Sequence, residues 1–265
     1  MRRGTRLIGV FDSGVGGLSA LTAARELLPT RDFLYFGDTA HVPYGTRSPD
    51  AILCLTRAAL AFLYEAGAEA ILVACGTASS VALPRICEEF PIPIYGIISP
   101  TVEAALAATK NYRIAIAATK RTVESGAFSA ALSCREGRVV SRGFPCPLFV
   151  PLVENGVLGK DDPLLHLAIC RHLAPLRSFG ADVLILGCTH FPLLADAIGG
   201  IYRDITLIDS GRAAAAQLLS LPPRVERGEC RFYVSDDPHS FENTAELFLG
   251  HAIRAERVTP RCSEF

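Results

Sequence analysis

The 265-residue sequence carries almost no net charge and no block of like charges. Lys and Arg together number 26 and Asp and Glu number 27, which gives a formal net charge of −1. This balance offers no electrostatic attraction to nucleic acid or to an anionic membrane surface. We therefore expect neither of these partners.

Long apolar runs are missing as well. Three arginines stand near the start of the sequence, and the apolar run that follows them, 7–11, ends at Asp12. That run is too short for the core of a signal peptide. Since no uninterrupted apolar stretch is long enough to span a bilayer, the sequence predicts a cytoplasmic protein. Hydrophobic residues make up 50% of it, which is enough for a large buried core.

The nine cysteines include no C-x-x-C pair. An odd number of cysteines without such a pair argues against a disulfide framework and against the common zinc sites. We therefore expect no metal, and we expect most of the thiols to be buried and unreactive.

One segment occurs twice in the sequence, and each copy ends on a cysteine. Residues 67–75 read GAEAILVAC and residues 180–188 read GADVLILGC. An apolar run bounded in this way is typical of a buried strand in a parallel sheet. Cys75 and Cys188 then lie just beyond the carboxyl ends of their strands, where open α/β sheets bind ligands. Two similar halves would present two thiols to one ligand from opposite sides.

Strand-like segments alternate with helical patterns along the sequence, which predicts parallel, doubly wound sheets. Since the order restarts, we expect an α/β fold of two pseudo-symmetric lobes, each flanked by helices, with the active site between them. The second lobe is expected to comprise 98–208. The first is expected to comprise 1–97 plus 209–265, because the ends of a domain often lie close together. The patterns also predict single helices over 77–90, 121–133 and 162–179, and an edge strand over 231–234.

Two loops at predicted strand ends are candidate ligand sites. The turn DSGVGG, 12–17, has neither the glycine spacing of a dinucleotide-binding turn nor the lysine of a P-loop. It is either a tight turn or a site where Asp12 and Ser13 bind a ligand, and its place at a strand end favours the site. The loop GDTAHVPYGTRS, 37–48, is either plain surface or a substrate lid that offers Tyr44 and backbone groups.

Several explanations compete for the two cysteines. They could be structural thiols, although packing explains two equivalent positions poorly. A metal site would need more ligands than His190, the one near in sequence. An acyl-transferring Cys–His enzyme needs one nucleophile and leaves the second cysteine unused. A proton acceptor paired with a proton donor uses both.

Five strings carry a family resemblance: IGVFDSGVGGL, YFGDTAHVPYG, VACGTASS, FVPLVENG and LGCTHFPLL. They resemble the signature blocks of cofactor-independent glutamate racemases of the aspartate/glutamate racemase superfamily, in the same order. The resemblance implies an enzyme that interconverts L- and D-glutamate without a cofactor and supplies D-glutamate for peptidoglycan. Because dimers are common in that family, it is also compatible with a homodimer.

The resemblance also implies roles for individual residues. Cys75 and Cys188 would be the catalytic acid and base, and Asp12, Glu154 and His190 would tune the two thiols. The substrate would be bound by Asp12, Ser13, Tyr44, Gly45, Gly76, Thr77, Thr189 and His190.

The sequence departs from the family pattern at two places. Gly76 stands where the family usually has asparagine, and Phe191 stands where tyrosine is common. If the asparagine donates a hydrogen bond to substrate, Gly76→Asn would lower KM, unless Gly76 adopts a positive φ. The substrate therefore stays open at this point: a racemase of aspartate or another amino acid, or a non-catalytic ligand-binding relative, is the alternative.

Overall fold

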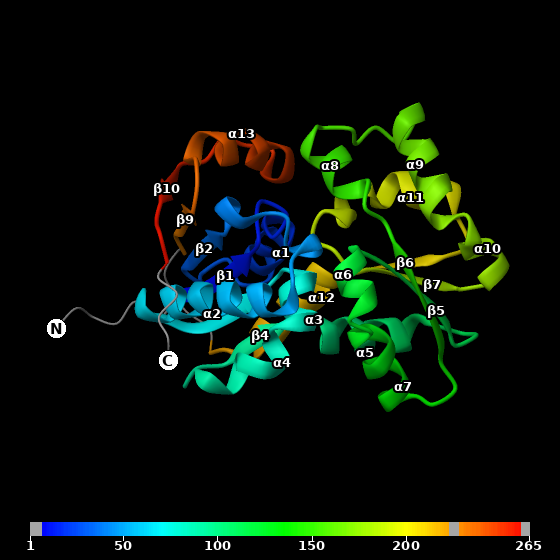
Figure 1. Cartoon of the computed structure of the whole chain (residues 1–265), viewed down its shortest axis with the longest axis horizontal. Helices are drawn as coiled ribbons and strands as arrows, with labels where there is room; N and C mark the ends of the chain where they lie inside the picture. Colours follow the sequence, from blue (N-terminus) through cyan, green and yellow to red (C-terminus); the bar gives the residue numbers. More distant parts are fainter. Residues whose placement is uncertain (1–6, 223–227, 261–265) are drawn as a thin grey trace.

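The computed structural model describes residues 7–222 and 228–260 and contains two parallel sheets (Figure 1). The six-stranded sheet has the order β10-β9-β2-β1-β3-β4. Its strands are β1 (Leu7–Asp12), β2 (Phe33–Gly37), β3 (Ala68–Val73), β4 (Ile94–Gly96), β9 (Cys230–Val234) and β10 (Ala255–Arg257). The four-stranded sheet has the order β6-β5-β7-β8. Its strands are β5 (Arg113–Ala118), β6 (Val140–Pro145), β7 (Val183–Leu186) and β8 (Thr206–Asp209).

The second sheet repeats the strand order of the first. The order β2-β1-β3-β4 in one sheet corresponds to β6-β5-β7-β8 in the other, so that β3 and β7 occupy equivalent positions. These are the two strands of the repeated segment. Their central residues, among them Ile71 and Ile185, are fully buried, as expected for strands covered by helices on both faces. The predicted two-lobed α/β fold is therefore confirmed.

Helices cover both sheets (Figure 1). Those that follow strands of the first sheet are α1 (Leu18–Leu27), α2 (Pro49–Glu65), α3 (Gly76–Val81), α4 (Leu83–Ile86), α5 (Ile98–Ala108) and α13 (Pro238–Leu249). Those that follow strands of the second are α6 (Lys120–Glu124), α7 (Ala127–Arg135), α8 (Phe149–Glu154), α9 (Pro163–Leu173), α10 (Pro175–Phe179), α11 (Ala195–Ile201) and α12 (Ser210–Ala216). Among the described residues, none of these helices is both long and apolar enough to cross a bilayer.

Each of the three helices predicted from the sequence is divided into shorter pieces. The helix expected over 121–133 is interrupted at Gly126, whose φ of 67° is left-handed and ends α6. The helix expected over 162–179 ends at Leu173, and Pro175 starts α10 because proline suits the first turn of a helix. The helix expected over 77–90 is divided into α3, α4 and a short 3₁₀ turn.

The strand expected at the sheet edge lies inside the sheet. β9 pairs with β2 on one side and with β10 on the other, so β10 is the edge strand. The carboxyl-terminal segment, coloured orange and red in Figure 1, thus extends the first sheet.

Two helices join the lobes by packing across the boundary. α5 follows β4 of the first sheet but packs against α7, β7 and β8 of the second. α12 follows β8 of the second sheet and packs against α1 and α5. The chain passes from one lobe to the other at α5 and returns at α12, and these two helices therefore pack against each other near the middle of the molecule.

Asp182 ties the start of β7 to the turn before β5. Its carboxylate accepts hydrogen bonds from the Thr109 hydroxyl at 2.6 Å and from the N–H groups of Lys110 and Asn111. Partial burial would raise the pKa of Asp182, but these hydrogen bonds outweigh it and hold the pKa below its usual value.

We expect Asp182→Ala to lower the free energy of unfolding by about 1–3 kcal/mol, because several donors lose their acceptor. Asp182→Asn keeps one acceptor oxygen and should lose less. Since the pKa is lowered on folding, this stabilisation is present at neutral pH and disappears as the pH falls below the usual range of aspartate. Urea unfolding at pH 7 and pH 3 measures both effects, with the exposed Asp204→Ala as control. Equal stability of Asp182→Ala and wild type at pH 7 would contradict the assignment.

Candidate active site

The two cysteines of the repeat lie at equivalent strand ends and face one cavity. β3 ends two residues before Cys75, and β7 ends two residues before Cys188. Both thiols are almost completely buried, with 5% and 7% of their surface exposed. They line a cavity of about 400 Å³ between the lobes. The lining also includes most of the other residues that the resemblance implies: Ser13, Tyr44, Gly45, Gly76, Thr77, Glu154, Thr189 and His190.

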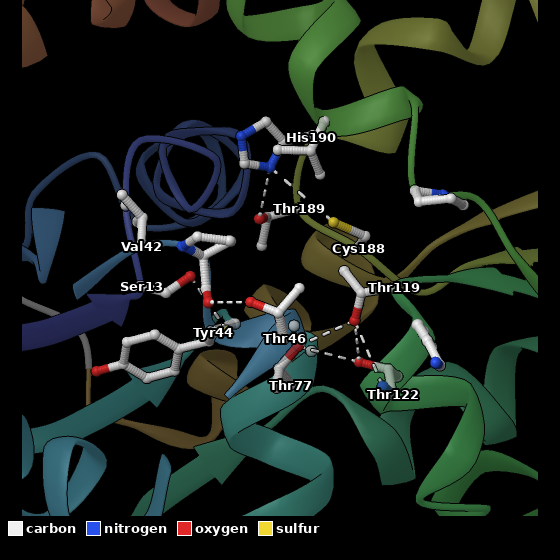
Figure 2. Close-up of a pocket in the computed structure, with 18 of the residues that line it drawn as sticks. Ser13, Val42, Tyr44, Thr46, Thr77, Thr119, Thr122, Cys188, Thr189 and His190 are labelled. Carbon is white, nitrogen blue, oxygen red and sulfur yellow. Dashed lines mark hydrogen bonds between the residues drawn. The ribbon is translucent and has the colours of Figure 1, made fainter. Parts of the chain in front are cut away.

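Cys188 is paired with a buried histidine and a glutamate. The His190 Nδ1 atom lies 3.9 Å from the Cys188 sulfur, as Figure 2 shows, and its Nε2 atom lies 2.9 Å from the Glu154 carboxylate. Glu154 comes from α8, so this chain of contacts joins two elements of the second lobe.

Histidine at this position keeps its proton at neutral pH. Burial alone would lower the pKa of His190, but hydrogen bonds to Cys188 and Glu154, together with the nearby charges of Cys188 and Asp12, raise it to about 10. An imidazolium at this distance stabilises negative charge on the Cys188 sulfur.

Cys75 has different partners. Its thiol donates to the Ser13 hydroxyl at 3.5 Å, and its sulfur accepts from the Ala78 N–H at 3.5 Å, which makes Cys75 the N-cap of α3. Burial, and next the negative charge of Asp12, raise the pKa of Cys75 to about 12. Cys75 is therefore a protonated thiol at neutral pH.

Asp12 acts on the site through its charge. It is fully buried and is absent from the lining of the cavity as far as the structure describes it. One carboxylate oxygen accepts from the Gly14 N–H at 3.0 Å, and the other has no hydrogen-bond partner among the described residues. Burial raises the pKa of Asp12, whereas the positive charge of His190 lowers it. The negative charge of Asp12 in turn raises the pKa of Cys75 and that of His190, the partner of Cys188.

The phenol expected to meet the substrate points elsewhere. Tyr44 lines the cavity, but its hydroxyl donates to Asp38 at 2.6 Å, and Figure 2 shows its ring directed away from Cys188. Asp38 also accepts from the Ser235 hydroxyl at 2.7 Å. The loop that contains Tyr44 and Gly45 is therefore anchored to the carboxyl end of β9.

Three threonine hydroxyls form a cluster across the cavity, and two of them were not predicted. Thr77 of α3 lies 3.1 Å from Thr119 and 3.3 Å from Thr122, and these two are 3.0 Å apart (Figure 2). Thr119 directly follows β5, the strand equivalent to β1. Asp12 and Ser13 stand at the end of β1, and Thr119 stands at the end of the equivalent strand β5. Extending the repeat from the cysteines to these two strand ends would therefore have predicted Thr119.

The constraint at Gly76 is steric. This glycine is outside the set of described glycines with positive φ, so the conformational reason considered from the sequence does not apply. A Cβ atom at Gly76 would lie 2.4 Å from the carbonyl oxygen of Gly187, in the other lobe. A side chain at 76 would therefore meet the Gly187 backbone unless one of the two segments shifts. The effect of Gly76→Asn on KM stays a prediction.

The described lining of the cavity offers neither a metal-binding cluster nor a disulfide. Within residues 7–222 and 228–260, no group of three or more His, Cys, Asp and Glu side chains is arranged to hold a metal ion. Cys75, Cys146 and Cys188, the cysteines that line the cavity, are free thiols. Cys54, on α2, is disulfide-bonded, which differs from the expectation that disulfides are absent.

Comparison with known proteins identifies the family. The family model described as Asp/Glu/Hydantoin racemase matches residues 17–218. A glutamate racemase from Persephonella marina is 40% identical over 252 residues, which cover 95% of this chain and 96% of that protein. The structure is similar to glutamate racemase from Thermus thermophilus in complex with β-chloro-D-alanine (38% identity, TM-score 0.87, 97% and 98% coverage). It is also similar to glutamate racemase from Francisella tularensis in complex with D-glutamate (32% identity, TM-score 0.89, 97% and 98% coverage).

Because the family model covers more than half of the chain and relatives of similar length match nearly all of it, this protein belongs to the Asp/Glu/Hydantoin racemase family.

Proposed function

We propose that this protein is a glutamate racemase that interconverts L- and D-glutamate with two cysteines. The observation that carries the proposal is the pair of buried thiols, Cys75 and Cys188, at equivalent strand ends around one cavity. Inversion at Cα needs a base on one face and an acid on the other, and such a pair can supply both. The similarity to proteins named glutamate racemase, one of them in complex with D-glutamate, supports glutamate as substrate.

In one direction Cys188 is the base. The positive charge of His190 stabilises the thiolate, which removes the Cα proton of glutamate and becomes a thiol. The Cys75 thiol then delivers its proton to the opposite face and becomes a thiolate. For the other enantiomer the two sulfurs exchange roles, with the same protons moving in reverse.

The cavity must stabilise the negative charge that develops on the substrate, because a Cα–H bond is far less acidic than a thiol. We infer that Ser13, Gly76 and Thr189, which follow strands β1, β3 and β7, surround the reacting end of the substrate. The threonine cluster, with three hydroxyl donors at one end of the cavity, suits the side-chain carboxylate. Asp12 tunes the thiols from behind this lining, and Glu154, which belongs to the lining, acts through His190.

We propose that two lobes enclose this site. The first comprises 1–97 plus 209–265, and the second comprises 98–208. The division of the strands between the two sheets supports these bounds, since β1–β4, β9 and β10 form one sheet and β5–β8 form the other. We further propose that the D-glutamate serves peptidoglycan synthesis and that the enzyme forms a homodimer. Equilibrium sedimentation tests the second statement, and a monomer at all concentrations would contradict it.

The alternatives are a racemase for aspartate or another amino acid and a relative that binds a ligand without turnover. Purified protein incubated with L-glutamate, without added cofactor, should form D-glutamate until the two enantiomers are equal in amount. A parallel incubation with L-aspartate should give far less inversion. Preferred inversion of aspartate would favour the first alternative, and binding of glutamate without inversion would favour the second.

Cys75→Ser and Cys188→Ser should each lower the racemisation rate by about 100- to 10,000-fold. A serine hydroxyl is similar in size to a thiol but is far less acidic. The Cys75 variant should fold, because serine is a preferred N-cap. Circular dichroism verifies folding, and Cys134→Ser, at an exposed thiol, is the matched control. Wild-type turnover in either active-site variant would contradict the two-thiol mechanism.

The pH dependence should report His190. We expect kcat/KM to stay level through neutral pH and to fall as the pH rises through about 10, where His190 loses its proton before Cys75 does. The decline should be equal in both directions, because the equilibrium constant between enantiomers is one. Glu154→Gln removes the charge that supports the imidazolium, so the decline should begin at lower pH.

Near neutral pH, Glu154→Gln should also lower kcat/KM by about 10- to 100-fold, the usual effect of losing a charge-assisted hydrogen bond. The exposed Glu65→Gln is the control and should leave the profile unchanged. An identical alkaline limb in Glu154→Gln and wild type would show that Glu154 does not act through His190.

A further inference from the structure

An aromatic side chain of α13 contacts the histidine of the site. The ring centroids of Phe248 and His190 are 5.6 Å apart, and the two rings are almost perpendicular, at 86°. This edge-to-face arrangement is a favourable one for two aromatic rings. Phe248 is absent from the lining of the cavity as far as the structure describes it. It can therefore act on the reaction only through the residues that it contacts.

α13 is held on the first lobe along one side. Phe241, Ala245 and Phe248 are four and three residues apart, so they lie on the same side of the helix. Phe241 and Ala245 are buried, and the Phe241 ring stacks on Tyr35 of β2 with centroids 5.9 Å apart. The Tyr35 hydroxyl donates to the Gly14 carbonyl at 2.6 Å, in the turn that follows β1. The helix is therefore fixed to the first-lobe half of the site.

The carboxyl end of α13 meets the second lobe. Phe248 packs against the hydrophobic core that residues between 115 and 202 form. Its neighbour Leu247 has a methyl carbon 4.0 Å from the position of a Cβ atom on Gly156, which comes two residues after α8. Figure 1 shows this end of α13 beside α8. The contact between Phe248 and His190 thus crosses the boundary between the lobes, next to the helix that carries Glu154.

The imidazole of His190 is held by two groups of its own lobe, and both lie at its nitrogen atoms. Nε2 lies 2.9 Å from the Glu154 carboxylate, and Nδ1 lies 3.9 Å from the Cys188 sulfur. Two such contacts leave the ring free to tilt about the line that joins them. A perpendicular aromatic ring restricts this tilt, and it also keeps water away from the imidazolium. Exclusion of water strengthens the attraction between opposite charges.

We propose that Phe248 is a positioning residue for racemisation, which holds the His190 imidazole against Cys188 from the other lobe. This inference rests on the proposed function. Because α13 belongs to the first lobe and His190 to the second, the support exists only while the lobes are together. The surroundings that stabilise the Cys188 thiolate are therefore completed by closure of the two lobes on each other.

The first test is Phe248→Ala assayed with L- and D-glutamate. We expect kcat/KM to fall by about tenfold in both directions, the equivalent of one lost edge-to-face pair. KM should change by less than about twofold, because Phe248 does not line the cavity. Phe90→Ala is the matched control, since Phe90 is also half-buried and forms an edge-to-face pair, with Tyr64, at 6.3 Å. It should keep wild-type kinetics.

A double-mutant cycle shows whether Phe248 acts through His190. An imidazole that no longer lies against Cys188 gains little from Glu154. The loss of kcat/KM in Phe248→Ala combined with Glu154→Gln should therefore be at least about threefold smaller than the product of the two single losses. The losses should simply multiply when Phe90→Ala is combined with Glu154→Gln. Losses that also multiply for Phe248→Ala would overturn the inference.

Phe248→Leu keeps the inference testable if Phe248→Ala fails to fold. Leucine keeps most of the apolar volume but has no ring, so kcat/KM should fall and the same coupling to Glu154→Gln should appear. Circular dichroism verifies folding of each variant. Wild-type kcat/KM in folded Phe248→Ala would overturn the inference. Failure of the wild type to racemise glutamate would instead overturn the proposed function, so the two failures are distinguishable.

Discussion

The rest of the site depends on the burial of two thiols away from water. A buried thiol resists losing its proton, and at Cys75 burial raises the pKa to about 12. Beside Cys188 lies the His190–Glu154 pair, and hydrogen bonds to Cys188 and Glu154 raise the pKa of His190 to about 10 against the effect of burial. The fold therefore has to bring a buried cation to one sulfur and keep it from the other. The short helix α8, which holds Glu154, provides this difference between the lobes.

The lobes are similar in strand order but different in chemistry. β3 and β7 occupy equivalent places and deliver their cysteines to the same cavity. The residues around each sulfur come from unrelated loops, Ser13 at one and His190 at the other. Symmetry of the backbone thus places the two sulfurs at equivalent strand ends around one cavity, whereas the side chains around each sulfur differ.

Much of the fold and part of the site could be predicted from the sequence, since apolar runs and strand ends are local signals. The repeat correctly predicted that Cys75 and Cys188 lie at equivalent strand ends. The division of helices at Gly126 was missed because one left-handed residue interrupts an otherwise helical pattern. The direction of the Tyr44 phenol depends on Asp38, which is held by the Ser235 hydroxyl, and the crowding at Gly76 depends on Gly187. Ser235 and Gly187 are far away in sequence, so no local pattern reveals these contacts.

The capping role of Cys75 couples chemistry to the backbone. Its sulfur accepts the Ala78 N–H and so completes the first turn of α3, the turn that carries Thr77. A sulfur anion is a stronger acceptor than a thiol and interacts favourably with the positive end of the helix. Loss of the Cys75 proton would therefore strengthen this cap, and Thr77, in the same turn, connects the cap to the threonine cluster.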